Sequence, residues 1–138
     1  TTGNTAKGTV TFTQKGDKVV VHAMVSGLAA GTHGFHIHEK GDCSSGDGMS
    51  TGGHFNPAGK AHGQHGAGEH HAGDLPSLKA DAAERAEARF RLAGLAIGSG
   101  ATDIVGRGLI VHVQPDDYKT QPTGNAGARI ACGVIQRQ

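Results

Sequence analysis

Residues 85–92, RAEARFRL, alternate strictly between polar and apolar side chains. Their composition favours a helix, because Ala, Glu, Arg and Leu all have high helix propensity. A helix would spread the arginines around its circumference, whereas a strand places successive side chains on opposite faces. The pattern therefore predicts a half-buried strand, whose apolar face is formed by Ala86, Ala88, Phe90 and Leu92.

The two-fold pattern recurs along the chain and predicts an all-β protein. Further strands are expected over 7–14, 17–26, 35–39, near Leu78, 108–113 and 128–135. The chain holds 24 glycines, and short strands joined by Gly-rich turns are typical of an antiparallel sandwich or barrel. Residues 27–34, GLAAGTHG, are expected to form a loop. Two long irregular connections remain, 39–74 and 113–127, and such connections usually carry function.

Length and charge narrow the class of protein. The 138 residues suit one domain, and the net charge is +1. No block of Lys or Arg indicates a nucleic-acid or membrane partner, and no apolar run approaches about 18 residues. The chain begins at Thr1 rather than Met, which we interpret as a processed form whose leader has been removed.

The motif HIH places His36 and His38 on the same face of a strand, while Ile37 points the other way. His112 lies in GLIVHV, where Leu109 and Val111 share the opposite face. We expect His112 to use the solvent-facing side of its strand and to meet the first two histidines across a sheet surface. Several imidazoles without a thiolate suit Cu(II) or zinc.

A second set of metal-binding side chains lies within the glycine-rich stretch 54–74, HFNPAGKAHGQHGAGEHHAGD. A flexible loop can fold around an ion, and the sequence His71-Ala-Gly-Asp74 can bring an imidazole and a carboxylate to the same ion. Three histidines and one aspartate suit a tetrahedral zinc site. The candidate zinc ligands are His54, His62, His71 and Asp74.

The cysteines are Cys43 and Cys132. An even number permits one disulfide but does not require it. The alternative interpretation is a pair of buried free thiols.

Several long motifs, in this order, resemble the copper/zinc superoxide dismutases: GFHIHEKGDC, GGHFNP, HAGDL, GLIVH and GNAGARIACGVI. Together they span residues 31–135. The resemblance implies that residues 1–138 form a single domain of this family. Its fold would be an immunoglobulin-like Greek-key β-sandwich or flattened barrel of about eight antiparallel strands, with two long functional loops.

The resemblance also assigns residue roles. Zinc would take the ligand set given above, and His54 would bridge zinc and copper as an imidazolate. Asp116 would link His36 and His62 through their outer ring nitrogens. The cysteines would form a Cys43–Cys132 disulfide. The copper ligands would be His36, His38, His54 and His112.

The implied activity is the dismutation of superoxide to dioxygen and hydrogen peroxide. Copper would alternate between Cu(II) and Cu(I), His54 would carry a proton, and Arg129 would guide the anion to copper. The alternative is a catalytically silent relative that binds zinc or copper. Since all four copper histidines and Arg129 are present, the enzyme is favoured.

The remaining histidines have simpler interpretations. His33 is expected to bond backbone beside the copper loop, and His22 to lie on the surface. His65 and His70 are expected to be solvated loop residues, or else auxiliary groups that capture metal.

Two features indicate a bacterial type of enzyme. The segment before Arg129 is short and lacks most guiding charges, for which Lys60 and Lys119 are candidate substitutes. Cys43 also lies further before GGHFNP than in animal enzymes. With a disulfide and a removed leader, we expect a periplasmic or secreted protein. A homodimer is also expected, because IVGRGLIVH and GVIQRQ resemble dimer-interface stretches of eukaryotic members.

Overall fold

The structure is a computed structural model that describes residues 6–64, 69–98, 100–121 and 124–136. β1 (Lys7–Lys15) and β2 (Lys18–Ser26) form an antiparallel hairpin, and β6 (Arg85–Ala93) adds to the other side of β2. The predicted strand at 85–92 is therefore confirmed. Its alternation matches burial, since Ala86 and Leu92 are buried while the arginines between and beside them are exposed.

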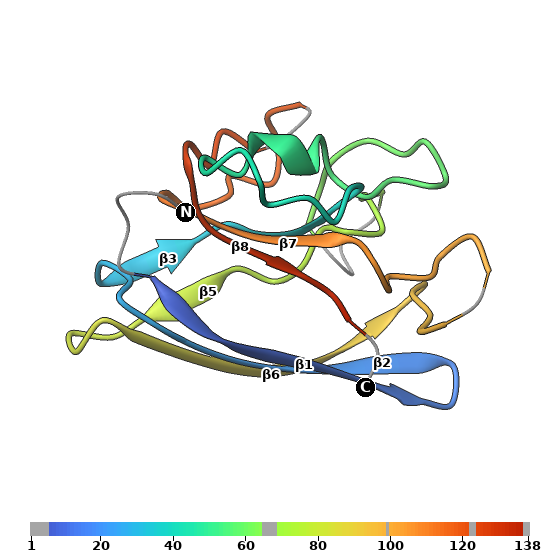
Figure 1. Ribbon diagram of the computed structural model, residues 1–138, viewed down its shortest axis with the longest axis horizontal. Helices are drawn as coiled ribbons and strands as arrows, with labels where there is room; N and C mark the ends of the chain where they lie inside the picture. The colour runs from blue at the N-terminus through green and yellow to red at the C-terminus, as the bar shows by residue number, and fades with distance from the viewer. Residues whose placement is uncertain (1–5, 65–68, 99, 122–123, 137–138) are drawn as a thin grey trace.

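A second sheet packs against the first in the order β4-β7-β8 (Figure 1). Its strands are β4 (Phe35–His38), β7 (Gly108–His112) and β8 (Arg129–Val134). Phe35 and Ile37 are fully buried in the core between the sheets, together with Val19 and Val21 of β2. The described residues form eight strands, and the expected antiparallel two-layer fold is confirmed.

The prediction of a loop at 27–34 was wrong in part. Gly31–His33 form a short strand, β3, that pairs with β5 (Leu78–Ala80). β3 carries no two-fold apolar pattern, so its partner, 45 or more residues away, determines that it is extended. His33, the last residue of β3, is buried.

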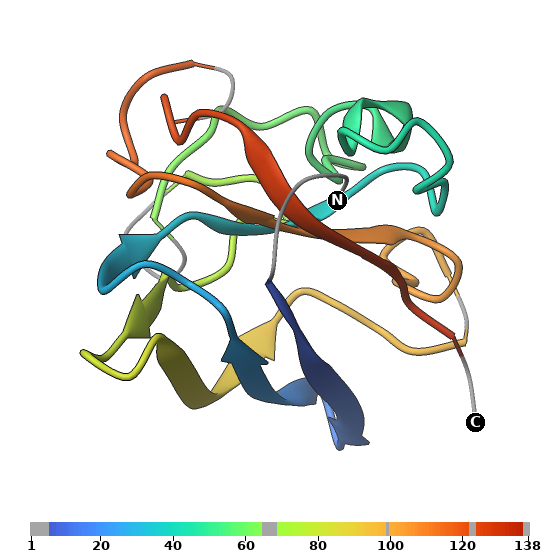
Figure 2. The same cartoon turned by 60° about the vertical axis from the view of Figure 1, so that its left-hand side comes forward.

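Two long connections cover the outer face of the second sheet (Figures 1 and 2). The first joins β4 to β5 and contains one short 3-10 helix, η1 (Met49–Thr51). The second joins β7 to β8. They correspond to the predicted connections 39–74 and 113–127. Because they lie on the face of β4 opposite to the core, they can enclose the histidines that this face carries.

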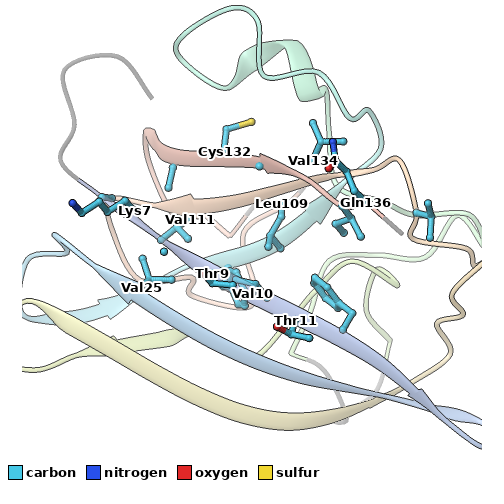
Figure 3. A pocket seen from close by; sticks show the side chains of 18 of the residues that line it. Lys7, Thr9, Val10, Thr11, Val25, Leu109, Val111, Cys132, Val134 and Gln136 are labelled. Carbon is cyan, nitrogen blue, oxygen red and sulfur yellow. The ribbon is translucent and has the colours of Figure 1, made fainter. Parts of the chain in front are cut away.

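The two sheets leave a groove between β1 and β8 (Figure 3). Within the described residues, β1 pairs only with β2 and β8 only with β7, so each is an edge strand. The groove has a volume of about 960 Å³ and is lined by partly buried apolar side chains that include Val10, Phe12 and Leu109. This side of the sandwich is therefore open in the described part of the chain.

The predicted disulfide is confirmed. Cys43 in the first connection bonds to Cys132 on β8, across a sequence separation of 89 residues. The bond ties the first connection to the second sheet. Among the described residues, no helix is long and apolar enough to cross a membrane.

Replacing both cysteines, Cys43→Ser with Cys132→Ser, should lower the free energy of unfolding of the metal-free protein. Closing a loop of this length in the unfolded chain is worth about 4–5 kcal/mol in the chain-entropy account. Urea denaturation of the oxidised protein and the double variant measures the difference. Equal urea midpoints and slopes for the two proteins would contradict the stabilising role.

Candidate metal centre

The outer face of the second sheet carries four buried histidines whose free ring nitrogens converge. His36 and His38 lie on β4 and His112 on the adjacent β7, and His54 pairs with His38 through an isolated bridge. One ring nitrogen of each lies within 4.8 Å of the others. Within the described residues four buried nitrogens have no hydrogen-bond partner: His36 Nδ1, His38 Nε2, His54 Nε2 and His112 Nε2.

The other ring nitrogens of three of these histidines each donate a hydrogen bond. His36 Nε2 donates to Asp116 Oδ2 at 2.7 Å, and His38 Nδ1 to the Gly52 carbonyl at 2.9 Å. His112 Nδ1 donates to a backbone carbonyl, that of Gly127, at 3.1 Å. These bonds fix the tautomers, so each remaining nitrogen presents its lone pair to the common centre.

Burial also keeps these rings neutral. It lowers the pKa of His36 to about 4, although the hydrogen bond to Asp116 opposes this. Burial likewise lowers the pKa of His38 to about 2 and that of His112 to about 3. A protonated imidazolium cannot ligate a metal, so these neutral histidines are in a ligating form at neutral pH. Four unpaired imidazole nitrogens fit copper.

The prediction that His112 uses a solvent-facing side of its strand was wrong. His112 is only 3% exposed, because the two long connections cover this face of the sheet. The expectation that it meets His36 and His38 is confirmed, with ring centroids 4.9 and 5.9 Å apart. Strand alternation distinguishes the two faces, but it does not show what covers them.

A second cluster of ligand atoms adjoins the first. Asp74 Oδ1 lies 2.8 Å from His62 Nδ1, 3.1 Å from His54 Nδ1 and 3.7 Å from His71 Nδ1. His54 Nδ1 lies 3.1 Å from His71 Nδ1. Ligands held at about 2.0–2.1 Å in a tetrahedron are separated by roughly 3.3–3.4 Å. The observed spacings bracket that value, so the set fits zinc.

His36 also lies within 4.8 Å of three members of this second cluster. Its Nε2, however, is bonded to Asp116, and its Nδ1 belongs to the first cluster. We therefore place His71 rather than His36 in the second cluster.

His54 contributes to both clusters. Its Nδ1 faces Asp74 and His71, and its unpaired Nε2 faces the first cluster. The ring stacks on that of His36 with centroids 4.0 Å apart. A bridging imidazole needs this arrangement, in which both nitrogens point inward.

Asp116 links the two clusters through the outer ring nitrogens of two candidate ligands. Its Oδ2 accepts from His36 and its Oδ1 accepts from His62 Nε2 at 2.8 Å, which is the linkage that the sequence predicts. Burial opposes its ionisation, but the hydrogen bonds to the two histidines hold the pKa of Asp116 well below its usual range. An ionised carboxylate fixes both ring orientations.

His62 differs from the other histidines. Burial lowers its pKa, but hydrogen bonds to Asp116 and Asp74 outweigh that effect and raise the pKa to about 9. Burial likewise disfavours ionised Asp74, yet hydrogen bonds to His54 and His62 lower its pKa. In the metal-free protein a proton therefore lies between His62 and Asp74. A zinc ion would displace this proton.

Arg129 lies beside the first cluster at the start of β8, paired with His112. Its Nη1 donates to the Gly52 carbonyl at 2.7 Å and to Thr51 Oγ1 at 3.0 Å. The Gly52 carbonyl also accepts from His38. Burial lowers the pKa of Arg129, although a guanidinium stays charged at neutral pH.

The other predicted residues lie apart from the clusters. His33 bonds the backbone carbonyls of His112 and Ala29, each at 2.7 Å. His70 Nδ1 donates to the His71 carbonyl, and His65 lies outside the described residues. His22 is half-buried on β2, beside Glu87 and Arg89. Lys60 and Lys119 are exposed.

Sequence reasoning missed the backbone groups and the glycine that support the candidate ligands. The carbonyls of Gly52 and Gly127 carry no side-chain signal. Gly124 has a φ of +75°, and a Cβ there would lie 1.8 Å from Asp116 Oδ1 and 2.6 Å from His62 Nε2. A glycine in a Gly-rich loop gives no sign that it leaves room for a carboxylate.

Gly124→Ala should lower the affinity for zinc by about tenfold or more, because displacing Asp116 removes the outer partner of His62. Competition with a chelator measures this. Gly16→Ala is the control, because Gly16 also has a positive φ but a Cβ there would meet nothing within 4 Å. Equal zinc affinity in the two variants would contradict the role of Gly124.

Comparison with known proteins places this arrangement in a family. The sequence model of the copper/zinc superoxide dismutases (SODC) matches residues 6–135. Superoxide dismutase (Cu-Zn) 2 from Brassica juncea is 44% identical over 140 residues, which cover 96% of this chain and 90% of that protein. A solved structure described as a crystal structure analysis of the clock protein EA4 is 42% identical. It matches with a TM-score of 0.88 over 94% of this chain and 86% of its own. The chain therefore belongs to the copper/zinc superoxide dismutase family.

Proposed function

We propose that this protein dismutates superoxide, converting two superoxide anions and two protons to dioxygen and hydrogen peroxide. The observation that carries the proposal is the position of His54, whose two nitrogens point into two adjoining ligand clusters. A chain that only stored zinc would need the second cluster alone. The first cluster, with four unpaired nitrogens and an arginine beside it, is what redox chemistry on a small anion needs.

We assign copper to His36, His38, His54 and His112, and zinc to His54, His62, His71 and Asp74. Copper supplies the one-electron redox couple, whereas zinc undergoes no redox change and holds the shared ring. The support for this assignment is the fit of each donor set, described above. The single domain over residues 1–138 stays a prediction.

His54 can deliver a proton where the peroxide forms. Its Nδ1 is held among Asp74 and His71, so the ring would keep its place while its Nε2 holds a proton. Nε2 can then take up a proton from solvent and donate it to the reduced anion. The overall reaction consumes two protons, and His54 Nε2 supplies one of them in each cycle.

Arg129 is proposed to bind the superoxide anion. Its guanidinium carries a fixed charge, and its Nη1 donates to the Gly48 and Gly52 carbonyls and to Thr51 Oγ1. Because the Gly52 carbonyl also holds His38, the cation keeps a fixed position relative to the copper ligands. A cation so placed attracts a small anion and orients it. Lys60 and Lys119 are proposed to guide the anion from further away.

We also propose a homodimer. The groove between β1 and β8 is lined by partly buried apolar side chains, and Val134 at its edge is 40% exposed. This edge includes part of the C-terminal stretch that resembles an interface. Sedimentation at increasing concentration tests the proposal, and a monomer at every concentration would refute it.

We further propose a bacterial-type enzyme that works in the periplasm or outside the cell. The disulfide supports an oxidising compartment. The short connection before Arg129 supports the bacterial type, whereas the relative named above is from a plant. Fractionation of the source cells tests the location, and recovery from the cytoplasm with reduced cysteines would refute it.

His112→Ala should abolish dismutase activity, because it removes a copper ligand and leaves the zinc set intact. Metal analysis should find zinc retained at one ion per chain and copper weakly held. Activity equal to that of the parent protein at full zinc loading would refute the copper assignment. If the parent protein itself binds both metals and shows no activity, the chain is instead a silent metal-binding relative.

Arg129→Ala should reduce the rate at least tenfold, because the anion loses its fixed cation, while copper and zinc remain bound. Arg129→Lys should retain part of the rate, since it keeps the charge but loses the planar fork. The rate should fall with ionic strength in the parent more steeply than in Arg129→Ala. An unchanged rate in the alanine variant would refute the guidance role.

A further inference from the structure

Three backbone segments meet beside the metal centre in a closed cycle of hydrogen bonds. Phe55 N–H donates to the Ile37 carbonyl at 2.8 Å, Ile37 N–H to the Gly73 carbonyl at 2.9 Å, and Gly73 N–H to the Phe55 carbonyl at 2.8 Å. We call these three residues the junction. Each residue uses both its donor and its acceptor within the cycle.

Every junction residue is the direct neighbour of a candidate ligand. Ile37 lies between His36 and His38, Phe55 follows His54, and Gly73 precedes Asp74. The junction therefore fixes the relative positions of β4 and the two parts of the first connection. A shift of any one segment would move a candidate ligand of at least one cluster.

The junction leaves no room for a side chain at Gly73. A Cβ there would lie 2.2 Å from the Ile37 carbonyl oxygen and 3.1 Å from Phe55 Cβ. Ile37 and Phe55 are buried, with 0% and 3% of their surface exposed. The cycle is thus tightly packed on the core side.

Arg107, just before β7, contacts the junction through the ring of Phe55. Its Cζ lies 4.3 Å from the centroid of the Phe55 ring. Its Nη1 donates to the Glu39 carbonyl at 3.0 Å, and its Nε to the Asp103 carbonyl at 3.3 Å. Glu39 follows His38 in the chain, so one guanidinium contacts the residues that follow two candidate copper ligands.

We propose that Arg107 is a positioning residue that acts through Phe55 to hold His54 where the two clusters meet. The inference rests on the proposed function, which gives His54 its role as a shared ligand. The contacts of Arg107 from which it is argued lie within the chain itself. A guanidinium suits the position, because it can lie over an aromatic face while it donates from its edge. A lysine can provide the charge but cannot make both contacts equally well.

The test compares Arg107→Met, Arg107→Lys and the control Arg91→Met, which removes an exposed arginine from β6. In the metal-free protein, amide exchange at Phe55 and Gly73 should become roughly tenfold faster in Arg107→Met, since both the ring contact and the donated bonds are lost. Arg107→Lys should show a smaller increase, about threefold. Exchange at Val21, in the middle of β2, should not change in any variant.

With metal added, Arg107→Met should bind zinc about tenfold more weakly than the parent, as expected when an outer support of a ligand is removed. The Cu(II) electron paramagnetic resonance spectrum of the copper- and zinc-loaded variant should differ from that of the parent. Arg107→Lys should restore most of the parent spectrum. The control should match the parent in both measurements.

A double-mutant cycle with Phe55→Leu isolates the ring contact. If Arg107 acts through Phe55, the effect of Arg107→Met on exchange at Gly73 should be much smaller in the leucine background. Equal effects in both backgrounds, or exchange that rises equally at Gly73 and Val21, would overturn the proposal. If the parent protein shows no dismutase activity, only the proposed function is refuted. The exchange measurements would still test the positioning role of Arg107.

Discussion

The sharing of one imidazole between two ligand clusters is the constraint on which the site depends. His54 directs both ring nitrogens inward, so its ring receives no outer hydrogen bond of the kind that holds His36, His38 and His112. Its position depends instead on the backbone and on the contacts of its Nδ1 with Asp74 and His71. Four buried nitrogens without partners would each cost about 1–3 kcal/mol, and metal ligation would offset this cost.

The sandwich supplies what the loops cannot supply alone. β4 and β7 place three histidines in fixed register, and the disulfide ties the first connection to β8. Arg129 and His38 then share the Gly52 carbonyl, so the anion-binding cation and a candidate copper ligand are held by the same loop atom. Rigid strands carry three of the four ligands of the first cluster, whereas the first connection carries all four of the second. The ring of His54 therefore lies between ligands carried by strands and ligands carried by the first connection.

Much of the fold was predictable because burial on one face of a strand leaves a two-fold pattern. That pattern identified 85–92 as a strand against its helical composition. It failed at Gly31–His33, where pairing with β5 rather than side-chain burial keeps the chain extended. It also failed to show that His112 is covered, since alternation separates two faces without revealing which of them a loop encloses.

The sequence by itself determined the strands with alternating burial, the family motifs and the candidate ligands, because these depend on residue type and local spacing. Only the tertiary structure decided which atoms meet: the two inward nitrogens of His54, the space left by Gly124 for Asp116, and the contact of Arg107 with Phe55. These contacts join segments far apart in the chain. Local residue patterns carry no record of such partners, so folding alone brings them together.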